Sequence, residues 1–315
     1  MRVPIFIISL IIIFSNGCFL LKHEEYPLVD RNNKLPADIT KVTPDLDQHP
    51  PLLHSNEFEQ PVPVQGGVNT KGAEDSPFIL PDGKTLYFFF TPDVRGPVEK
   101  QILDSVTGVW VSEFENGIWE EAKRVWLIEP GKISLDGAVC VEDTLMWFAS
   151  VREGYEGVNM FTAEFDGEKW INCQYCGDLL MKDYKIGEVH LHKDTLYFHS
   201  TRDDGKGGLD IWYTVKKDDG WSEPINFSIL NTQGDDGFPF ISKDGNEFWF
   251  SRTYMGTPAI FRSKKINNNW GEPELMVSQF AGEPTLDEDG NLYFVHHFFR
   301  NDTMIEADIY FSKRK

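Results

Sequence analysis

The stretch LYFHSTRDDGKGGLDIWY, residues 196–213, decides the fold of this 315-residue chain. Two aromatic-rich apolar runs flank a polar segment that contains Gly205, Gly207 and Gly208. Short runs rich in aromatic and β-branched residues, bounded by Gly and Asp, are typical of β-strands. The stretch therefore predicts two neighbouring strands of an antiparallel sheet.

The same pattern recurs along the chain. One pair of an aromatic residue and Phe recurs in each of five copies, with the Phe residues 60, 50, 52 and 44 positions apart: Tyr87-Phe88, Trp147-Phe148, Tyr197-Phe198, Trp249-Phe250 and Tyr293-Phe294. In three copies an Asp-Gly turn precedes the pair, which is a strong hairpin signal because Gly tolerates positive φ. Each copy holds three or four short apolar runs and no helical period. Four-stranded units repeated about every 50 residues predict the blades of a β-propeller.

The last copy ends at Lys315, directly after its third predicted strand. Phe58-Glu59-Gln60-Pro61 stands alone before the first copy and mimics Trp221-Ser222-Glu223-Pro224. We interpret it as the outer strand of the last blade, which would close the ring and remove two exposed sheet edges. The predicted fold is all-β: a five-bladed propeller with four-stranded antiparallel blades, closed by an N-terminal strand.

With the turn WSEPINFSILNTQGDDGFPFISKDG at 221–245, the opening stretch resembles the WD40-like β-propeller repeat of the TolB type. The resemblance extends over 57–315, but the first copy carries an insertion at 91–107, and the second and fifth copies lack parts of the pattern. It implies a propeller and says little about activity, because such repeats serve envelope complexes, peptidase accessory domains and orphan lipoproteins.

The N-terminus, MRVPIFIISLIIIFSNGC, has one basic residue and an apolar run, which predicts an export signal at 1–17. Ser15 to Cys18 resembles the lipobox of bacterial lipoproteins, which implies lipidation of Cys18. An ordinary cleaved signal and an uncleaved anchor stay open as alternatives. Residues 18–56 contain five prolines and no strand or helix period, so we expect an extended linker to the propeller at 57–315. We expect a periplasmic or cell-surface protein that contacts the membrane only through this end.

The composition of the chain excludes some classes of partner and of activity. Lys and Arg number 30 and Asp and Glu 50, giving a net charge of −20 that repels phosphate backbones and excludes nucleic acid as the main partner. Four cysteines are too few for a disulfide framework. The sequence shows no Gly-x-Ser-x-Gly elbow, no His-Glu-x-x-His motif and no phosphate-cradling loop. We expect a monomer without a cofactor.

Several charged residues are candidates for a binding site. An acidic residue stands near the start of each predicted inner strand, so we expect one ring of five carboxylates at a channel mouth: Asp75, Asp136, Glu188, Asp236 and Glu283. The ring would bind a cation or a polyhydroxyl ligand, or its members would only accept hydrogen bonds within the repeat. Arg152, Arg202 and Arg252 would pair with these acids or clamp an anionic group. His190 shares a strand face with Glu188 and His192, but a fourth ligand is missing, so we predict no metal.

We therefore expect a cell-envelope binding or scaffolding module without catalytic activity, recognising an envelope protein or a carbohydrate at the channel mouth. The alternative is a glycoside hydrolase. Five-bladed propellers of family 43 use an Asp base, a second Asp and a Glu acid in blades one to three, and Asp75, Asp136 and Glu188 occur in that order. Inverting hydrolysis needs two carboxyl groups roughly 6.5–9.5 Å apart.

Overall fold

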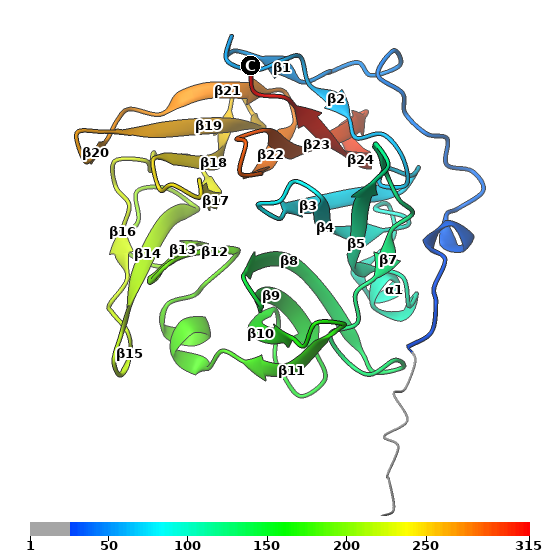
Figure 1. Ribbon diagram of the computed structural model, residues 1–315, viewed down its shortest axis with the longest axis horizontal. Helices are drawn as coiled ribbons and strands as arrows, with labels where there is room; N and C mark the ends of the chain where they lie inside the picture. The colour runs from blue at the N-terminus through cyan, green and yellow to red at the C-terminus, as the bar shows by residue number, and fades with distance from the viewer. Residues whose placement is uncertain (1–25) are drawn as a thin grey trace, which may run out of the picture.

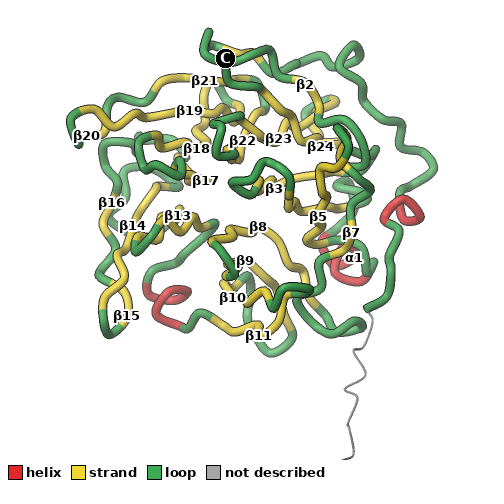
Figure 2. The backbone as a smooth tube through the Cα atoms, viewed as in Figure 1, coloured by secondary structure: helices red, strands yellow, loops and turns green. Residues whose placement is uncertain are grey.

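A computed structural model describes residues 26–315 (Figure 1). Cys18 and the predicted export signal lie outside the described residues. Between residues 26 and 315, no helix has the length and apolar character needed to cross a membrane. Strands dominate this part of the chain, and the three short helices lie at its periphery (Figure 2): η1 (Arg31–Lys34), α1 (Val98–Leu103) and η2 (Leu179–Asp183).

The strands form antiparallel units arranged around a common centre (Figure 1), which confirms the all-β propeller prediction. Blade one contains β3 (Ala73–Ile79), β4 (Thr85–Thr91), β5 (Gly108–Glu115), β6 (Ile118–Trp119) and β7 (Lys123–Arg124). Blade two contains β8 (Ser134–Glu142), β9 (Leu145–Arg152), β10 (Asn159–Phe165) and β11 (Trp170–Tyr175). Blade three contains β12 (Val189–His192), β13 (Thr195–Ser200), β14 (Asp210–Lys217), β15 (Gly220–Trp221) and β16 (Ile225–Asn226).

Blade four contains β17 (Asp236–Ile241), β18 (Glu247–Tyr254), β19 (Thr257–Ile266), β20 (Asn269–Trp270) and β21 (Glu274–Ser278). Blade five contains β22 (Ala281–Leu286), β23 (Leu292–Arg300) and β24 (Thr303–Ser312). Two strands from before blade one join these sheets at their outer edges. The first, β1 (Leu52–Leu53), pairs with β21, and the second, β2 (Val62–Pro63), pairs with β24.

The second pairing joins the two ends of the propeller. Val62 is the register partner of Phe311, Phe58 forms a bridge with Arg314, and the Glu59 amide donates to the Lys313 carbonyl over 2.8 Å. The segment that mimics the Trp motif therefore lies beside β24, and the regular strand begins just after it. We retain five blades closed by an N-terminal strand as our interpretation of this pairing.

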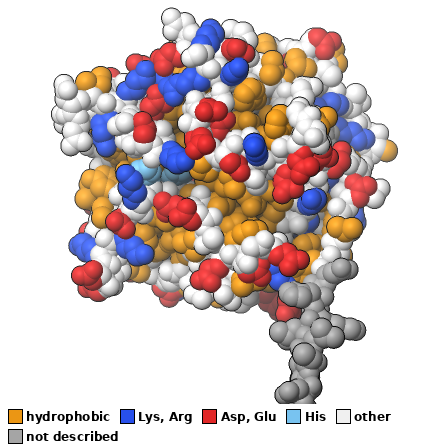
Figure 3. Space-filling view, viewed as in Figure 1, with side chains coloured by type: hydrophobic (Ala, Val, Ile, Leu, Met, Phe, Trp, Pro, Cys, Tyr) orange, Lys and Arg blue, Asp and Glu red, His pale blue; other side chains and the backbone are white. Residues whose placement is uncertain are grey.

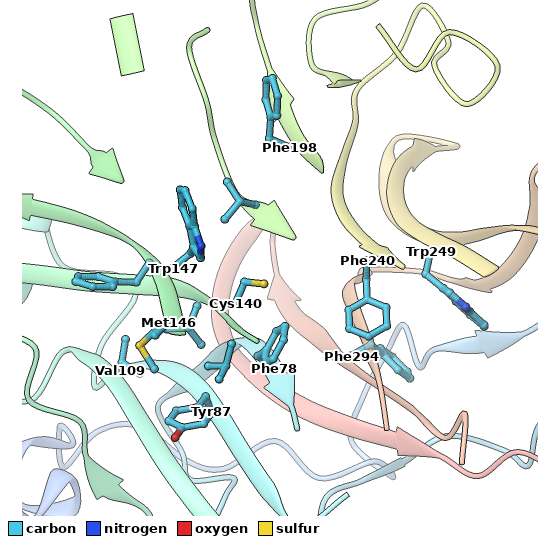
Figure 4. Close-up of a cluster of buried hydrophobic side chains, with 14 of the residues drawn as sticks. Phe78, Tyr87, Val109, Cys140, Met146, Trp147, Phe198, Phe240, Trp249 and Phe294 are labelled. Carbon is cyan, nitrogen blue, oxygen red and sulfur yellow. The ribbon is translucent and has the colours of Figure 1, made fainter. Parts of the chain in front are cut away.

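Burial explains why the aromatic pairs recur. The Phe of every pair is fully enclosed, at 0% exposure: Phe88, Phe148, Phe198, Phe250 and Phe294. Each sits on a middle strand and belongs to a cluster of buried apolar side chains, and Figure 4 shows Phe198 and Phe294 in one of these clusters. The predicted Asp-Gly turns are present as well, because Gly83, Gly245 and Gly290 have φ of 66°, 76° and 78°, which Gly adopts without strain.

The described part of the predicted linker, 26–56, packs against the blades along the side of the molecule (Figure 1, blue). Arg31 is 2% exposed and contacts blade one. Lys41 forms ion pairs with Glu306 and Asp308 of blade five. The prediction of an extended linker therefore needs correction for residues 26–56, because this segment is bound to the propeller. Lack of periodicity in the segment does not prevent single charged side chains from finding buried partners.

Candidate functional site

The strand register shows that the five predicted acids are not equivalent. One inner-strand residue of each blade lies opposite the first member of its aromatic pair: Phe78, Cys140, His190, Phe240 and Thr285. The acids precede these residues by different numbers of positions. Glu188 and Glu283 stand two positions before them in the sequence, and Asp75 stands three positions before. Asp136 and Asp236 stand four positions before. The single ring of five carboxylates is therefore wrong. In four blades a bulge just before this residue shifts the register, and spacing in the sequence does not reveal it.

Asp136 and Asp236 have a structural role inside their own blades. Asp136 accepts hydrogen bonds from Ser150 Oγ at 2.6 Å and from Arg152 Nη2 at 3.1 Å. Asp236 accepts from the Thr232 amide at 2.6 Å and from Arg252 Nε at 2.5 Å. Both carboxylates are buried, so these contacts replace the water that they lose. Arg152 and Arg252 thus pair with acids, as one of the two predicted alternatives stated.

Blade one has the same arrangement, but its acid is Glu74, which the sequence analysis missed. Glu74 stands four positions before Phe78 and accepts from the Thr70 amide at 2.9 Å and from Thr70 Oγ1 at 2.7 Å. Its arginine is Arg31, which comes from the N-terminal segment. The spacing from Thr70 to Glu74 equals that from Thr232 to Asp236, and this signal could have identified Glu74.

Blade three departs from this pattern. Ile186 stands four positions before His190, where the other blades discussed above carry an acid. Arg202 lies over the rings of Trp212 and Tyr184, with its guanidinium carbon 4.8 Å and 5.8 Å from the ring centroids. The predicted role of Arg202 as the partner of a carboxylate is therefore wrong, and the residue makes cation–π contacts instead.

The remaining acids lie together near the central channel. One ligand atom each from Asp75, Glu283 and His297 lies within 4.8 Å of the others, although the residues come from β3, β22 and β23. Asp75 Oδ1 is 3.6 Å from His297 Nε2. The Glu283 amide donates to Ser251 Oγ at 2.8 Å, which holds this residue at its left-handed φ of 54°. Glu188 lies close enough to interact electrostatically with both acids.

Burial and mutual repulsion separate the protonation states of these groups. Burial, and then the negative charge of Asp75, raise the pKa of Glu188 to about 8. Burial, Asp75 and Glu188 likewise raise the pKa of Glu283 well above its usual value. Burial acts against ionisation of Asp75, but the charge of His297 and the hydrogen bond from the Ser76 amide outweigh it, so the pKa of Asp75 is lowered. Burial opposes the charged form of His297, but the neighbouring Asp75 and Glu283 outweigh it and raise its pKa, so Asp75 and His297 favour each other's charged forms.

Aromatic side chains fill the channel next to this cluster. The ring of His190 lies 4.4 Å from that of Phe240 and 6.0 Å from that of Phe78, measured between centroids. Figure 4 shows Phe78, Phe240 and Cys140 directed toward the channel from three blades. Burial lowers the pKa of His190 to about 3, so its imidazole is neutral. We call Phe78, His190 and Phe240 the channel plug.

A cavity lies on each side of the channel plug. One, of about 40 Å³, is lined by Glu188 and Glu283 and has room for about one water molecule. The other, of about 330 Å³, is lined mainly by apolar side chains and includes His192. We call it the apolar mouth. His190 borders both cavities, whereas Glu188 and His192 lie at different ones, so the strand face that carries these three residues does not form a shared metal site.

Comparisons with known proteins identify no family. No family model matches the sequence, and no curated protein matches it. Among solved structures, the endo-arabinase of Bacteroides thetaiotaomicron has 15% identity and a TM-score of 0.49, covering 80% of this chain and 98% of that one. TolB of Acinetobacter baumannii has 12% identity and a TM-score of 0.46, covering 78% of this chain and 55% of that one. The chain thus spans about half the length of that TolB.

A third solved structure is the catalytic domain of a GH62 α-L-arabinofuranosidase from Coprinopsis cinerea, with 11% identity and a TM-score of 0.48. The match covers 84% of this chain and 98% of that domain. TolB, the endo-arabinase and the α-L-arabinofuranosidase thus resemble the chain about equally. At these identities and TM-scores the likeness gives no information on activity, and the propeller assignment stands on the strand pairing itself.

Proposed function

We propose that this protein is a binding module of the cell envelope, and that it recognises a protein partner through the apolar mouth. The observation that carries this proposal is the cavity of about 330 Å³ lined by Phe78, Leu80, Leu191, Phe240 and Leu286. In Figure 3, hydrophobic side chains gather over the middle of one face and charged groups surround them. An apolar hollow with a polar rim marks an interaction site in a protein whose surface is otherwise strongly charged.

The lining of the apolar mouth suits one or more apolar side chains of a partner. Pockets of this kind hold the anchor residues that dominate protein interfaces. The rim carries four acids, Glu142, Asp143, Asp287 and Glu288, against two lysines, Lys193 and Lys243. An apolar anchor flanked by basic residues would therefore complement both the cavity and its rim.

The cellular setting of the proposal rests on the sequence. Residues 1–17 have the pattern of an export signal, and Cys18 stands where lipoproteins carry their lipid. We propose that a monomer is held at the periplasmic or cell-surface side of a membrane by this end. The apolar mouth would then be available to proteins of the same compartment.

Site-directed photo-crosslinking tests the proposed surface. Leu191 is half-buried in the apolar mouth, whereas Ile225 is exposed on β16, at the outside of blade three. A photo-reactive residue at Leu191 of the full chain, expressed in the envelope, should give a discrete crosslinked protein that is absent when the same residue replaces Ile225. Substituting Leu80 by Asp should abolish the product. Equal products from both positions, or none from Leu191, would contradict the proposal.

A glycoside hydrolase is the second candidate. The observation in its favour is the contrast between the raised pKa of Glu188, from burial and the neighbouring Asp75, and the lowered pKa of Asp75 beside His297, because such a pair can act as acid and base. Against it, Asp136 is enclosed with Arg152, and the cavity at Glu188 has a volume of only about 40 Å³, too small for a sugar ring. Arabinan and xylan hydrolysis that is lost in both Asp75→Asn and Glu188→Gln would establish the hydrolase. Absence of hydrolysis by the wild-type chain would exclude it for these two glycans.

A further inference from the structure

We propose that Asp75, Glu283 and His297 form a binding site for a divalent transition-metal ion in the channel. The three side chains offer two carboxylate oxygens and one imidazole nitrogen within 4.8 Å of one another. Ligand atoms bound at 2.0–2.2 Å in a tetrahedral site lie about 3.4 Å apart. The separation of 3.6 Å between Asp75 Oδ1 and His297 Nε2 is close to that value, and it is too long for a good hydrogen bond.

The propeller repeat does not account for this cluster. Asp75 stands three positions before Phe78, and each of the other blades has glycine at the corresponding position: Gly137, Gly187, Gly237 and Gly282. A Cβ atom at Gly187 would lie 2.1 Å from His199 Nε2, and one at Gly137 would lie 2.9 Å from the Phe89 ring. Blades two and three therefore have no room for a side chain there, whereas at Gly282 of blade five the nearest atom, Ser251 Oγ, lies at an ordinary contact distance of 3.4 Å. Blade one alone places a carboxylate at this position, so the site is asymmetric, as a ligand site would be.

Glu283 provides a second observation in favour of a bound ion, independent of the distances within the cluster. Its Oε2 atom is enclosed by protein and has no hydrogen-bond partner. A buried carboxyl oxygen without a partner is costly, and each such atom in a folded protein calls for a ligand, a water molecule or a functional role. The same side chain belongs to the three-residue cluster and borders the cavity of about 40 Å³. This cavity has room for about one water molecule, which could complete the coordination of an ion held by three protein ligands.

The ligand chemistry indicates the class of ion. One imidazole with two carboxylates suits Zn²⁺ or Mn²⁺ better than Ca²⁺, which takes six to eight oxygens. The two positive charges of such an ion would also offset the electrostatic repulsion among Asp75, Glu188 and Glu283, which surround a single imidazole. Glu188 lines the same small cavity as Glu283, where it would accept a hydrogen bond from a water molecule bound to the ion.

A competing explanation is that the carboxyl groups of Asp75 and Glu283 simply share a proton. The two explanations differ in what an added ion does: a metal site binds one ion with an affinity that falls when Asp75 or His297 is substituted, whereas a shared proton requires no ion. Calorimetric titration of the ion into the protein measures this affinity directly. The inference does not depend on the proposed partner binding, since the cluster and the apolar mouth lie on opposite sides of the channel plug.

The test uses the full chain, stripped with a chelator and dialysed. We expect calorimetry to show one equivalent of Zn²⁺ or Mn²⁺ bound, and the ion to raise the melting temperature, since it binds only the folded state. His297→Asn and Asp75→Asn should each weaken binding by about tenfold or more. His192→Asn is the matched control, because His192 lies at the apolar mouth and should leave binding unchanged.

Melting curves of each stripped variant show whether it is folded, so that lost binding is not confused with lost structure. The proposal is overturned if neither ion binds, if Ca²⁺ binds more tightly than both, or if His297→Asn binds as tightly as the wild type. It is also overturned if His192→Asn weakens binding as much as His297→Asn, because the ion would then occupy a different site.

Discussion

Nη1 of Arg31 lies 3.0 Å from Oε1 of Glu74, and this ion pair, 2% and 0% exposed, joins the N-terminal segment to the innermost strand of blade one. Arg31 also donates to the Val68 carbonyl over 2.7 Å and lies over the rings of Phe90 and Trp110. Arg152 and Arg252 make corresponding contacts from within their own blades. Blade one thus takes from outside the repeat the arginine that blades two and four encode themselves.

We expect Arg31→Ala to lower the free energy of unfolding by about 3–5 kcal/mol, because it leaves the Glu74 carboxylate buried without its partner. Urea denaturation of the full chain measures the loss. Arg95→Ala is the control, since Arg95 pairs with Asp38 and Asp93 at the surface and should cost no more than about 1 kcal/mol. Similar losses for the two variants would show that the N-terminal segment is not held by the buried pair.

The closing segment depends on Phe58, whose ring packs edge-on against Trp249 with centroids 5.8 Å apart. Phe58 is fully buried, so Phe58→Ala should cost about 3–5 kcal/mol, and deletion of 57–64 should unfold the ring. Phe114→Ala offers a comparison at a partly exposed site on β5 and should cost much less. A deletion that leaves the melting temperature unchanged would refute the proposed closure.

Glu57 should make this closure sensitive to acid. Arg262 donates to both of its carboxylate oxygens, over 2.9 and 2.7 Å, and mainly through these bonds lowers the pKa of Glu57 from 4.5 to about 2. Because the folded-state pKa is depressed, the stability that Glu57 contributes is complete above about pH 4.5 and is lost as the pH falls toward 2.

The matching experiment compares Glu57→Gln with the wild type in urea at pH 6 and pH 3. The variant should be less stable at pH 6, and the difference should shrink at pH 3. Glu59→Gln, an exposed neighbour, should show no such trend. A constant difference across this range would mean that the ion pair with Arg262 contributes no pH-dependent stability.

The different roles of the inner-strand acids predict different losses of stability when each acid is replaced by its amide. Asp236→Asn should be strongly destabilising, because it removes the charge that Arg252 and the Thr232 amide contact in a buried setting. Asp75→Asn should cost clearly less, because it also relieves repulsion with Glu188 and Glu283. Equal losses in thermal denaturation would indicate that Asp75 belongs to the repeat framework after all.

The propeller could be predicted because its signals are local. Each copy has an aromatic residue next to Phe, with an Asp-Gly turn before the pair in three copies and a polar turn after it. These features can be recognised in the sequence without knowledge of any tertiary contact. The buried Phe88 and Phe250 and the left-handed Gly83 and Gly245 are direct consequences of these patterns.

The site could be predicted only in part, because its geometry depends on register and on partners far away in the sequence. A bulge between Asp75 and Phe78 separates acids that look equivalent in the sequence, and this shift hid the structural role of Glu74. His297 was visible in the sequence but had no apparent partner, since Asp75 lies more than 200 residues earlier. Arg31 stands in a segment without any period, so its burial could not be anticipated.

The pairing of residues 57–63 with 310–315 has a consequence for the order of folding. A chain that is synthesised from its N-terminus presents Phe58 and Val62 early, yet their strand partners arrive with the last few residues. Blades two to four can form from local contacts before that moment. The final ring contacts span almost the entire chain, and such distant contacts slow folding. An unfinished chain would expose the free edges of blades one and five, so premature termination should yield an aggregation-prone protein rather than a smaller stable one.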